Sequence, residues 1–174
     1  LNALGSEGIK RMSSVAVLSS WYLFNKLKSE FPTLPFGAED VQRLHEFIIT
    51  LPESTFTKIS ENGIPKSQII GKLGKLFLDF GIHAPTVSFP EPFGLMIEPT
   101  ESEAKTELDR FIQAMLCIRD EIRQIEDGNW PADDNPLVNS PHTAAFAQSD
   151  SWTHPYSRQL GCLPITGQAV SKYW

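Results

Sequence analysis

Cysteine and histidine are scarce in this sequence. Only 2 Cys and 4 His occur among 174 residues, and they are scattered along the chain. A disulfide framework needs several cysteines at close spacing, and a structural zinc site needs four Cys or His ligands in short pairs. The sequence therefore predicts no metal site. We expect Cys117 and Cys162 to be free thiols, which favours a reducing compartment.

Long hydrophobic runs and concentrations of positive charge are also lacking. A membrane-spanning helix needs about 20 consecutive apolar residues, and no stretch approaches that length. The 15 Lys and Arg residues are outnumbered by 21 Asp and Glu residues, which gives a net charge of −6. A surface that follows the phosphates of nucleic acid needs clustered Lys and Arg. We therefore expect neither a membrane nor nucleic acid as a partner.

An apolar segment that leads into a long helix is the clearest local pattern. Residues 95–98 are typical of a strand, and Pro99 stops it. Thr100 and Glu103 have the spacing of a capping box, which predicts a helix start at Thr100. Gly128 should end this helix as the residue after its C-cap. Apolar residues recur along the helix at steps of three and four, namely at Ala104, Leu108, Phe111, Ile112, Met115, Ile118, Ile122 and Ile125.

Upstream of this segment, hydrophobic periodicity predicts two more helices and two more strands. The helices cover about residues 9–27 and 65–81, the second of them ending at Gly81. Alternating apolar residues at 45–51 and a short run at 86–89 predict strands. Residues 52–63 are polar and rich in turn formers, so we expect an exposed loop there.

These elements predict an α+β fold with a three-stranded, mainly antiparallel sheet and flanking helices. We expect one small domain at residues 1–128. Residues 129–174 are rich in Pro, Asp and Asn and show little periodicity, which predicts an irregular tail that wraps over this domain or over a neighbour. Aromatic side chains would anchor the tail, namely Trp152, Tyr156, Tyr173 and Trp174. The helix at the start has no strand before it, so we expect the chain to be part of a longer polypeptide.

Separated motifs in a fixed order make the chain resemble a known enzyme family. They are HEFI at 45–48, FGIHAPT at 80–86, MIEPTESE at 96–103, ELDRF at 107–111, PHT at 141–143 and WTHPYSR at 152–158. In this order they resemble the C-terminal part of glycine dehydrogenase (decarboxylating), the P-protein of the glycine cleavage system. The resemblance covers most of the chain.

The resemblance implies a fragment of a larger enzyme that uses pyridoxal 5′-phosphate. Members of the family have the fold of aspartate aminotransferase (fold type I), in which a large domain holds the cofactor through a lysine Schiff base and a small C-terminal domain closes over the site. The lysine segment of the large domain is absent here. We therefore expect this chain to be the small domain, to hold no cofactor and to be inactive alone.

The family's reaction also implies partners. The full-length enzyme decarboxylates glycine and transfers the aminomethyl group to the lipoyl arm of H-protein. The expected partners are H-protein with its lipoyl-lysine, the remainder of the P-protein, and a second copy in a homodimer. The expected compartment is the cytoplasm of a bacterium or the mitochondrial matrix of a eukaryote.

No residue of the chain is predicted to be catalytic, but several are candidates for the substrate pocket. Most of them have an alternative structural role. Glu98 and Glu101 can complement the positive end of a helix dipole. A neutral His83 can form a hydrogen bond to the backbone, and Arg158 can hold the tail in place through a salt bridge. His45, beside Glu46, is interpreted as structural. The pocket candidates are His83, Glu98, Thr100, Glu101, His142 and Arg158.

Two departures from the family pattern keep a second hypothesis open. Residues 19–22 read Ser-Ser-Trp-Tyr where the family commonly reads Asn-Ala-Asn-Tyr, and the segment before His45 lacks the usual Gly-Asn-Gly-Arg character, with Glu39 and Asp40 in that stretch. The alternative is therefore a divergent, non-catalytic relative that acts as a structural or interaction domain. A third hypothesis is an independent acidic binding module.

Overall fold

The chain folds into two units, each built from two separate stretches of sequence. The structure, a computed structural model, describes residues 3–89 and 91–167. Unit 1 consists of Leu1–Leu51 and Pro85–Ile112, and unit 2 consists of Pro52–Ala84 and Gln113–Trp174. The division predicted at residue 128 was drawn from composition rather than from contacts, and it stays a prediction.

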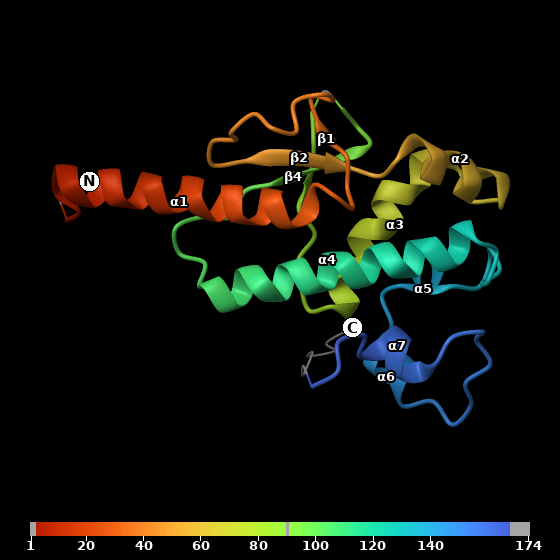
Figure 1. Cartoon of the computed structure of the whole chain (residues 1–174). Helices are drawn as coiled ribbons and strands as arrows, with labels where there is room; N and C mark the ends of the chain where they lie inside the picture. Colours follow the sequence, from red (N-terminus) through yellow and green to blue (C-terminus); the bar gives the residue numbers. More distant parts are fainter. Residues whose placement is uncertain (1–2, 90, 168–174) are drawn as a thin grey trace. The chain divides into compact units, whose positions relative to one another are not determined.

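Unit 1 contains a four-stranded antiparallel sheet (Figure 1). The strands follow the order β1-β2-β4-β3, and their bounds are Thr33–Leu34 for β1, Phe47–Thr50 for β2, Thr86–Val87 for β3 and Gly94–Ile97 for β4. The predicted α+β class is confirmed, but the sheet has four strands rather than three. Strand β1 was missed because two residues between prolines carry no readable alternation.

Alternation along β2 and β4 puts one face of the sheet into the core of unit 1. Phe47 and Ile49 on β2 are buried, as are their partners Ile97 and Leu95 on β4. The register pairs Phe47 with Ile97 and Ile49 with Leu95. Successive side chains of a strand point to opposite faces, so this register gathers the four buried side chains on one face.

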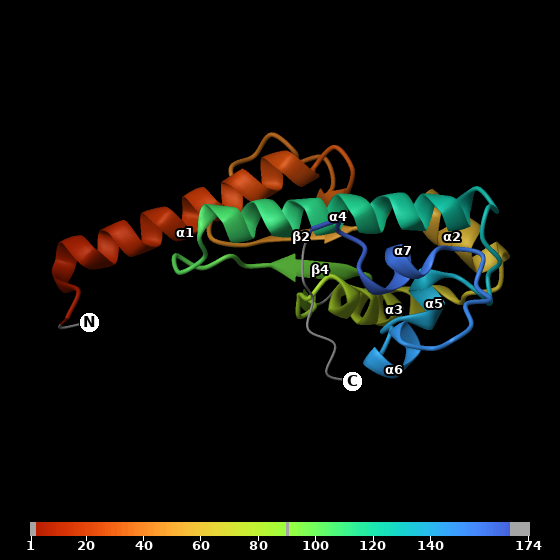
Figure 2. The same cartoon turned by 90° about the horizontal axis from the view of Figure 1, so that it is seen from below.

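Helix α1, Gly5–Leu27, lies alongside this sheet (Figures 1 and 2). Its C-terminal half buries Leu23, Phe24 and Leu27. The Phe24 ring meets the Phe47 ring edge-on at 5.6 Å between centroids, a favoured geometry for two aromatic rings. The N-terminal half of the helix extends beyond the sheet (Figure 1). The predicted helix is confirmed, although only one part of its apolar face is covered.

The first residue of β4 has to be a glycine. A Cβ atom at Gly94 would lie 2.8 Å from both Ile48 Cγ2 and Ser88 Oγ. Those distances are shorter than non-bonded contacts of a Cβ atom allow. The same Cβ atom would also lie 3.2 Å from the carbonyl oxygen of Ile49. Gly94 therefore allows β2 to pair closely with the start of β4.

Helix α4, Lys105–Glu126, begins later than the sequence predicts. The predicted capping box is wrong, because the Thr100 hydroxyl bonds to the Ser102 hydroxyl at 2.6 Å and the chain turns again before the helix. The Ala104 carbonyl accepts the first helical N–H bonds. The predicted end is confirmed: Gly128 has φ +71°, and the bonds from Gly128 N to Ile125 O and from the next residue's N to Gln124 O form a Schellman motif.

Unit 2 begins with a helix where the sequence predicts an exposed loop. Helix α2, Glu53–Glu61, follows Pro52, whose carbonyl accepts N–H bonds from the first turn. Thr55, Phe56 and Ile59 are buried on one side of it. Ser and Thr have weak helix propensity, so the polar composition pointed to a loop. Burial of the apolar stripe overrides that propensity.

Helix α3, Lys66–Asp79, confirms the predicted second helix, and Gly81 follows it with φ +68°. The tail adds three short helices, α5 (Pro136–Asn139), α6 (Ala144–Ala147) and α7 (Arg158–Cys162), each with a polar side chain at its N-cap. Figure 2 shows α5 beside α3, in agreement with their contacts. Of the predicted tail anchors, Tyr156 is buried and Trp152 is half-buried, while Tyr173 and Trp174 lie outside the described residues.

In the part of the chain that the structure describes, none of the helices is both long enough and apolar enough to cross a membrane.

Candidate functional site

Polar side chains gather in unit 1 where β4 ends and β2 begins. The antiparallel register that pairs Phe47 with Ile97 brings His45 and Glu46, just before β2, next to Glu98, just after β4. His45 Nε2 lies 3.8 Å from Glu98 Oε1 and 4.0 Å from Glu46 Oε2. All three side chains are about half exposed. We call these three residues the strand-end triad.

The other two predicted candidates of unit 1 follow in the same loop. Thr100 and Glu101 are exposed, and they are separated from Glu98 by the buried Pro99. Because α4 begins only at Lys105, neither Glu98 nor Glu101 lies in its first turn. The interpretation that these carboxylates complement a helix N-terminus therefore does not hold. The structure leaves them as exposed polar groups on one loop.

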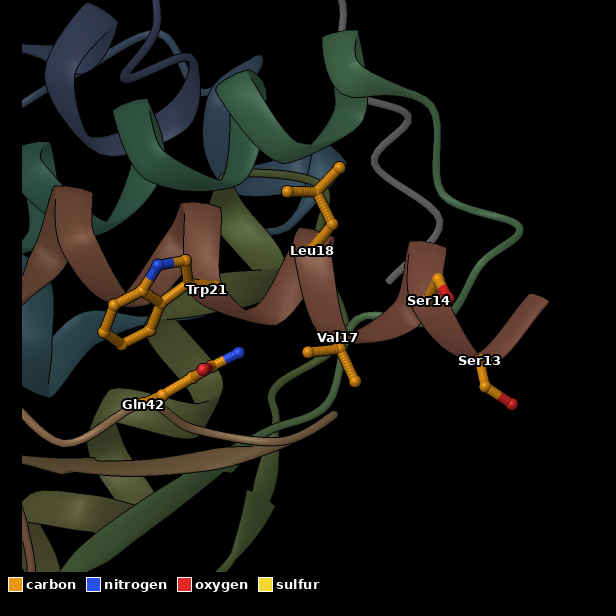
Figure 3. Close-up of a pocket in the computed structure, with 6 residues that line it drawn as sticks. All are labelled: Ser13, Ser14, Val17, Leu18, Trp21 and Gln42. Atoms are coloured by element: carbon orange, nitrogen blue, oxygen red, sulfur yellow. The ribbon is translucent and has the colours of Figure 1, made fainter. Parts of the chain in front are cut away.

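A shallow apolar groove of about 400 Å³ runs along α1 in the same unit (Figure 3). Figure 3 shows the Gln42 side chain, from the segment before β2, beside the indole ring of Trp21. Trp21 is held in place by stacking on Phe24, with ring centroids 5.2 Å apart. The remaining lining residues come from α1 and are Ser13, Ser14, Val17 and Leu18. We call this feature the α1 groove.

A polar contact joins α1 to the start of α4. The Tyr22 hydroxyl donates to Asp109 Oδ1 at 2.6 Å, and Lys105 Nζ donates to Asp109 Oδ2 at 2.7 Å. Hydrogen bonds from Lys105 and Tyr22 lower the pKa of Asp109, and the same contacts raise the pKa of Lys105. Lys105 is exposed and Tyr22 and Asp109 are partly exposed, and we interpret this contact as one that positions the two helices.

In unit 2, His142 belongs to a buried hydrogen-bond network around Asp79. The Asp79 carboxylate accepts three bonds of 2.8 Å, from the Ser140 hydroxyl, the His142 backbone N–H and His142 Nδ1. His142 Nε2 lies 2.8 Å from the Tyr156 hydroxyl oxygen, which also accepts from Asn139 at 2.8 Å. Asp79 and His142 are essentially inaccessible to solvent. We call these five residues the Asp79 network.

The Asp79 network fixes the orientation of the His142 ring. A carboxylate oxygen accepts hydrogen bonds, so we assign a proton to His142 Nδ1, which faces Asp79, while Nε2 faces the Tyr156 hydroxyl. Burial raises the pKa of Tyr156, which keeps its hydroxyl protonated. A Cβ atom at Gly161 would lie 2.8 Å from Tyr156 Cε2 and 2.9 Å from His142 Nε2, so the tail packs directly on this bond.

Sequence reasoning did not find Asp79, although a signal exists. Asp79 is the last residue of α3, where the negative end of the helix dipole disfavours a carboxylate. An acid in that place, inside an apolar helix end, needs donors from elsewhere in the chain. Ser140 and His142 supply them from the tail, far along the sequence.

Glu121 is a second buried acid that sequence reasoning missed. It lies on α4 and is 6% exposed, and burial raises its pKa, with the negative charges of Asp79 and Asp120 adding to the effect. Its Oε2 atom has no hydrogen-bond partner in the described residues. The signal was present, because Ile118 and Ile125 place position 121 on the apolar face of the helix.

The candidates of unit 2 have different surroundings. Arg158 donates from Nη2 to the Ser149 carbonyl at 2.6 Å, and its guanidinium lies over the Trp152 ring at 5.5 Å. The Trp152 ring also stacks near the His142 ring, with centroids 6.0 Å apart. Arg158 and His142 therefore flank one tryptophan. His83 is exposed.

A second shallow groove, of about 460 Å³, lies beside Arg158 in unit 2. It is lined by Ala144, Ala147, Gln148, Arg158, Gln159, Cys162 and Leu163. The structure thus brings Glu98, Thr100 and Glu101 together in unit 1, while His83, His142 and Arg158 belong to unit 2. Their assignment to a substrate pocket stays a prediction.

Comparison of the chain with known proteins identifies its family. The family model described as "Glycine dehydrogenase, C-terminal domain" matches residues 12–142, which is most of the chain. The chain belongs to this family. Proteins named glycine dehydrogenase (decarboxylating) from Yersinia pestis (strain Pestoides F) and Yersinia pseudotuberculosis serotype O:1b (strain IP 31758) are each 47% identical to it over 175 residues, which cover 100% of this chain.

The chain spans 17% of the length of these curated relatives. The predicted resemblance to the C-terminal part of glycine dehydrogenase (decarboxylating) is therefore confirmed. The family match includes the strand-end triad, Thr100, Glu101 and His142, whereas Arg158 lies beyond it. The family domain thus contains every predicted pocket residue except one.

Proposed function

We propose that this chain is the C-terminal small domain of a glycine decarboxylase that uses pyridoxal 5′-phosphate and has the fold type I architecture. The observation that carries the proposal is the 47% identity along the whole chain to enzymes named glycine dehydrogenase (decarboxylating). The α+β fold of the chain is consistent with a small domain of that class. In the proposed reaction the complete polypeptide releases the carboxylate of glycine as CO₂ and passes the aminomethyl group to the lipoyl arm of H-protein.

The cofactor would be held outside this chain. Pyridoxal phosphate needs a lysine amine in a closed pocket for its Schiff base, and it supplies the electron sink for loss of the carboxylate. Lysine side chains line neither the α1 groove nor the groove beside Arg158. These two grooves therefore offer no amine for the Schiff base, and we assign this chain no step on the cofactor.

The proposed contribution of this chain is positional. Unit 1 presents Glu98, Thr100 and Glu101 as exposed polar groups on one loop, beside a sheet whose register holds that loop in place. We propose that this loop forms part of the wall of the substrate entrance, where closure of a small domain excludes water. Proposed partners are the remainder of the polypeptide, H-protein and a second copy. The proposed compartment is the cytoplasm in a bacterium or the mitochondrial matrix in a eukaryote.

The test is exchange of labelled bicarbonate into glycine by the complete polypeptide, loaded with cofactor and mixed with lipoylated H-protein. We expect exchange in the complete protein and none after deletion of residues 1–174. The substitution Glu98→Ala should lower the exchange rate, while Glu53→Ala, at an exposed acid of unit 2, should not. Absence of exchange in a complete, cofactor-loaded protein would refute the proposal.

A second measurement tests whether the cofactor is held by this chain or by the rest of the polypeptide. The isolated chain, incubated with pyridoxal phosphate and dialysed, should show no absorbance in the Schiff-base band beyond that of its exposed lysines. The complete polypeptide, treated in the same way, should keep the band. A stoichiometric band on the isolated chain would contradict the placement of the cofactor outside it.

One observation favours a second function, that of a non-catalytic structural or interaction domain. Trp21 stands where the family commonly has an asparagine, and its ring lines the apolar α1 groove with Val17 and Leu18. Leu18 is 66% exposed. An indole cannot replace the hydrogen bonds of an asparagine amide. In this alternative the complete polypeptide lacks exchange activity even when loaded with cofactor, and Trp21→Asn does not restore it.

A further inference from the structure

We propose that the strand-end triad of His45, Glu46 and Glu98 is a binding site for a divalent transition-metal ion of the Zn²⁺ or Mn²⁺ type. This proposal is independent of the proposed function. One nitrogen or oxygen atom from each side chain lies within 4.8 Å of the other two. The sequence alone predicted no metal site, because Glu98 is far from His45 along the chain.

The donor atoms suit such an ion. One imidazole nitrogen and two carboxylate oxygens form a mixed nitrogen and oxygen ligand set of the kind that binds zinc, iron or manganese, and three protein ligands leave positions open for water or a small molecule. Bonds of about 2.1 Å to one ion place two ligand atoms about 3.0–3.4 Å apart. His45 Nε2 now lies 3.8 Å from Glu98 Oε1 and 4.0 Å from Glu46 Oε2. Small rotations of these half-exposed side chains would close the remaining gaps.

Charge favours a cation at this place. Some other acids of unit 1 are paired with a basic side chain, such as Asp109 with Lys105 and Glu107 with Arg110. Among residues 3–89 and 91–167, the only ion-pair partner of Glu46 and Glu98 is His45. When that imidazole is neutral, as a metal ligand must be, two carboxylates face each other without a counter-ion.

The nearest arginine in sequence does not supply that counter-ion. Arg43 directs its guanidinium over the Phe24 ring, 4.9 Å from the centroid. The two pairing distances of His45 are also longer than hydrogen bonds, so the imidazole does not tie up either carboxylate. The ligand atoms are therefore available to an ion.

The backbone under the triad is held in place. The paired strands fix the separation of Glu46 and Glu98, because Phe47 and Ile97 are opposite each other in the register. Glu98 precedes Pro99, which is buried and restricts Glu98 to extended backbone. For Glu46 and Glu98 it is mainly the side-chain rotations that the ion would have to order, which lowers the entropic cost of binding.

The experiment is calorimetric titration of the full chain with ZnCl₂ and, separately, with MnCl₂. We expect one equivalent to bind. The substitutions His45→Asn and Glu98→Gln should each weaken that binding by at least about tenfold, since even indirect disturbance of a metal ligand has effects of that size. The matched controls are His83→Asn and Glu101→Gln, which remove an exposed histidine and a neighbouring exposed glutamate outside the triad. They should leave the affinity unchanged.

A second readout separates a metal site from a simple ion pair. In NMR spectra of the histidine ring protons, Zn²⁺ should shift the signals of His45 and leave those of His83 in place. Far-UV circular dichroism shows that each variant is folded. The proposal is overturned by the absence of binding in both titrations, by equal weakening in the triad and control variants, or by His45 ring signals that do not respond to Zn²⁺.

Discussion

Removal of the Asp79 carboxylate should strongly destabilise unit 2. Asp79 is fully buried and accepts three hydrogen bonds of 2.8 Å from Ser140 and His142. The substitution Asp79→Ala leaves the two His142 donors without an acceptor, whereas the Ser140 hydroxyl keeps the Pro136 carbonyl as an acceptor. Each such donor costs about 1–3 kcal/mol, and the costs in one cluster overlap. We therefore expect a loss of about 2–5 kcal/mol in the free energy of unfolding.

The assay is equilibrium unfolding of the chain in urea, followed by far-UV circular dichroism. Asp133→Ala is the matched control, because Asp133 is an exposed aspartate of the same unit. We expect the control to change the free energy of unfolding by less than about 0.5 kcal/mol. A loss below about 1 kcal/mol for Asp79→Ala would refute the reasoning, because it would mean that the two His142 donors find other partners or water.

A double-mutant cycle tests the cause of that loss. Ser140→Ala removes one donor and should cost about 1 kcal/mol in the wild-type chain. In the Asp79→Ala background the same substitution should cost less, because the hydroxyl has already lost its bond to Asp79 and keeps only its bond to the Pro136 carbonyl. Additive losses would show that the serine and the aspartate do not act through their hydrogen bond.

Three further outcomes follow from the packing. Gly161→Ala should destabilise the chain by about 1–3 kcal/mol, because the added methyl group overpacks the site. Gly71→Ala has open space at its Cβ atom and should stabilise the chain by about 0.5–1 kcal/mol. Urea unfolding measures both changes. Glu121, whose pKa is raised by burial, binds its proton more tightly when folded, so its contribution is present below pH 4.5 and is lost as pH rises through the folded pKa. Glu121→Gln should therefore flatten the pH dependence of the stability of the chain above pH 4.5, as read from urea midpoints. Ile118→Ala should lower the free energy of unfolding by about 2–5 kcal/mol, because Ile118 is fully buried. Leu116→Ala, at the exposed edge of the same helix, should lower it by less than about 1 kcal/mol. Urea unfolding measures both changes.

Local patterns predicted those elements whose ends are set by the chain itself. Gly128 and Gly81 take positive φ after α4 and α3, which only glycine does at no cost. The alternation of Phe47 and Ile49 gave β2 and its buried face. Patterns failed where two local solutions compete. Thr100 bonds to Ser102 instead of capping α4, and the polar composition of α2 hid a buried stripe.

The sequence by itself determined the family, the α+β class and the helices and strands with strong periodicity. Those properties depend on the order of residues and on contacts between near neighbours in the chain. Only the tertiary structure decided which polar groups meet. His45 reaches Glu98 through the register of β2 and β4, and Asp79 reaches His142 because the tail packs on the end of α3. Such meetings depend on burial and pairing between distant segments, for which a single sequence has no periodic signal.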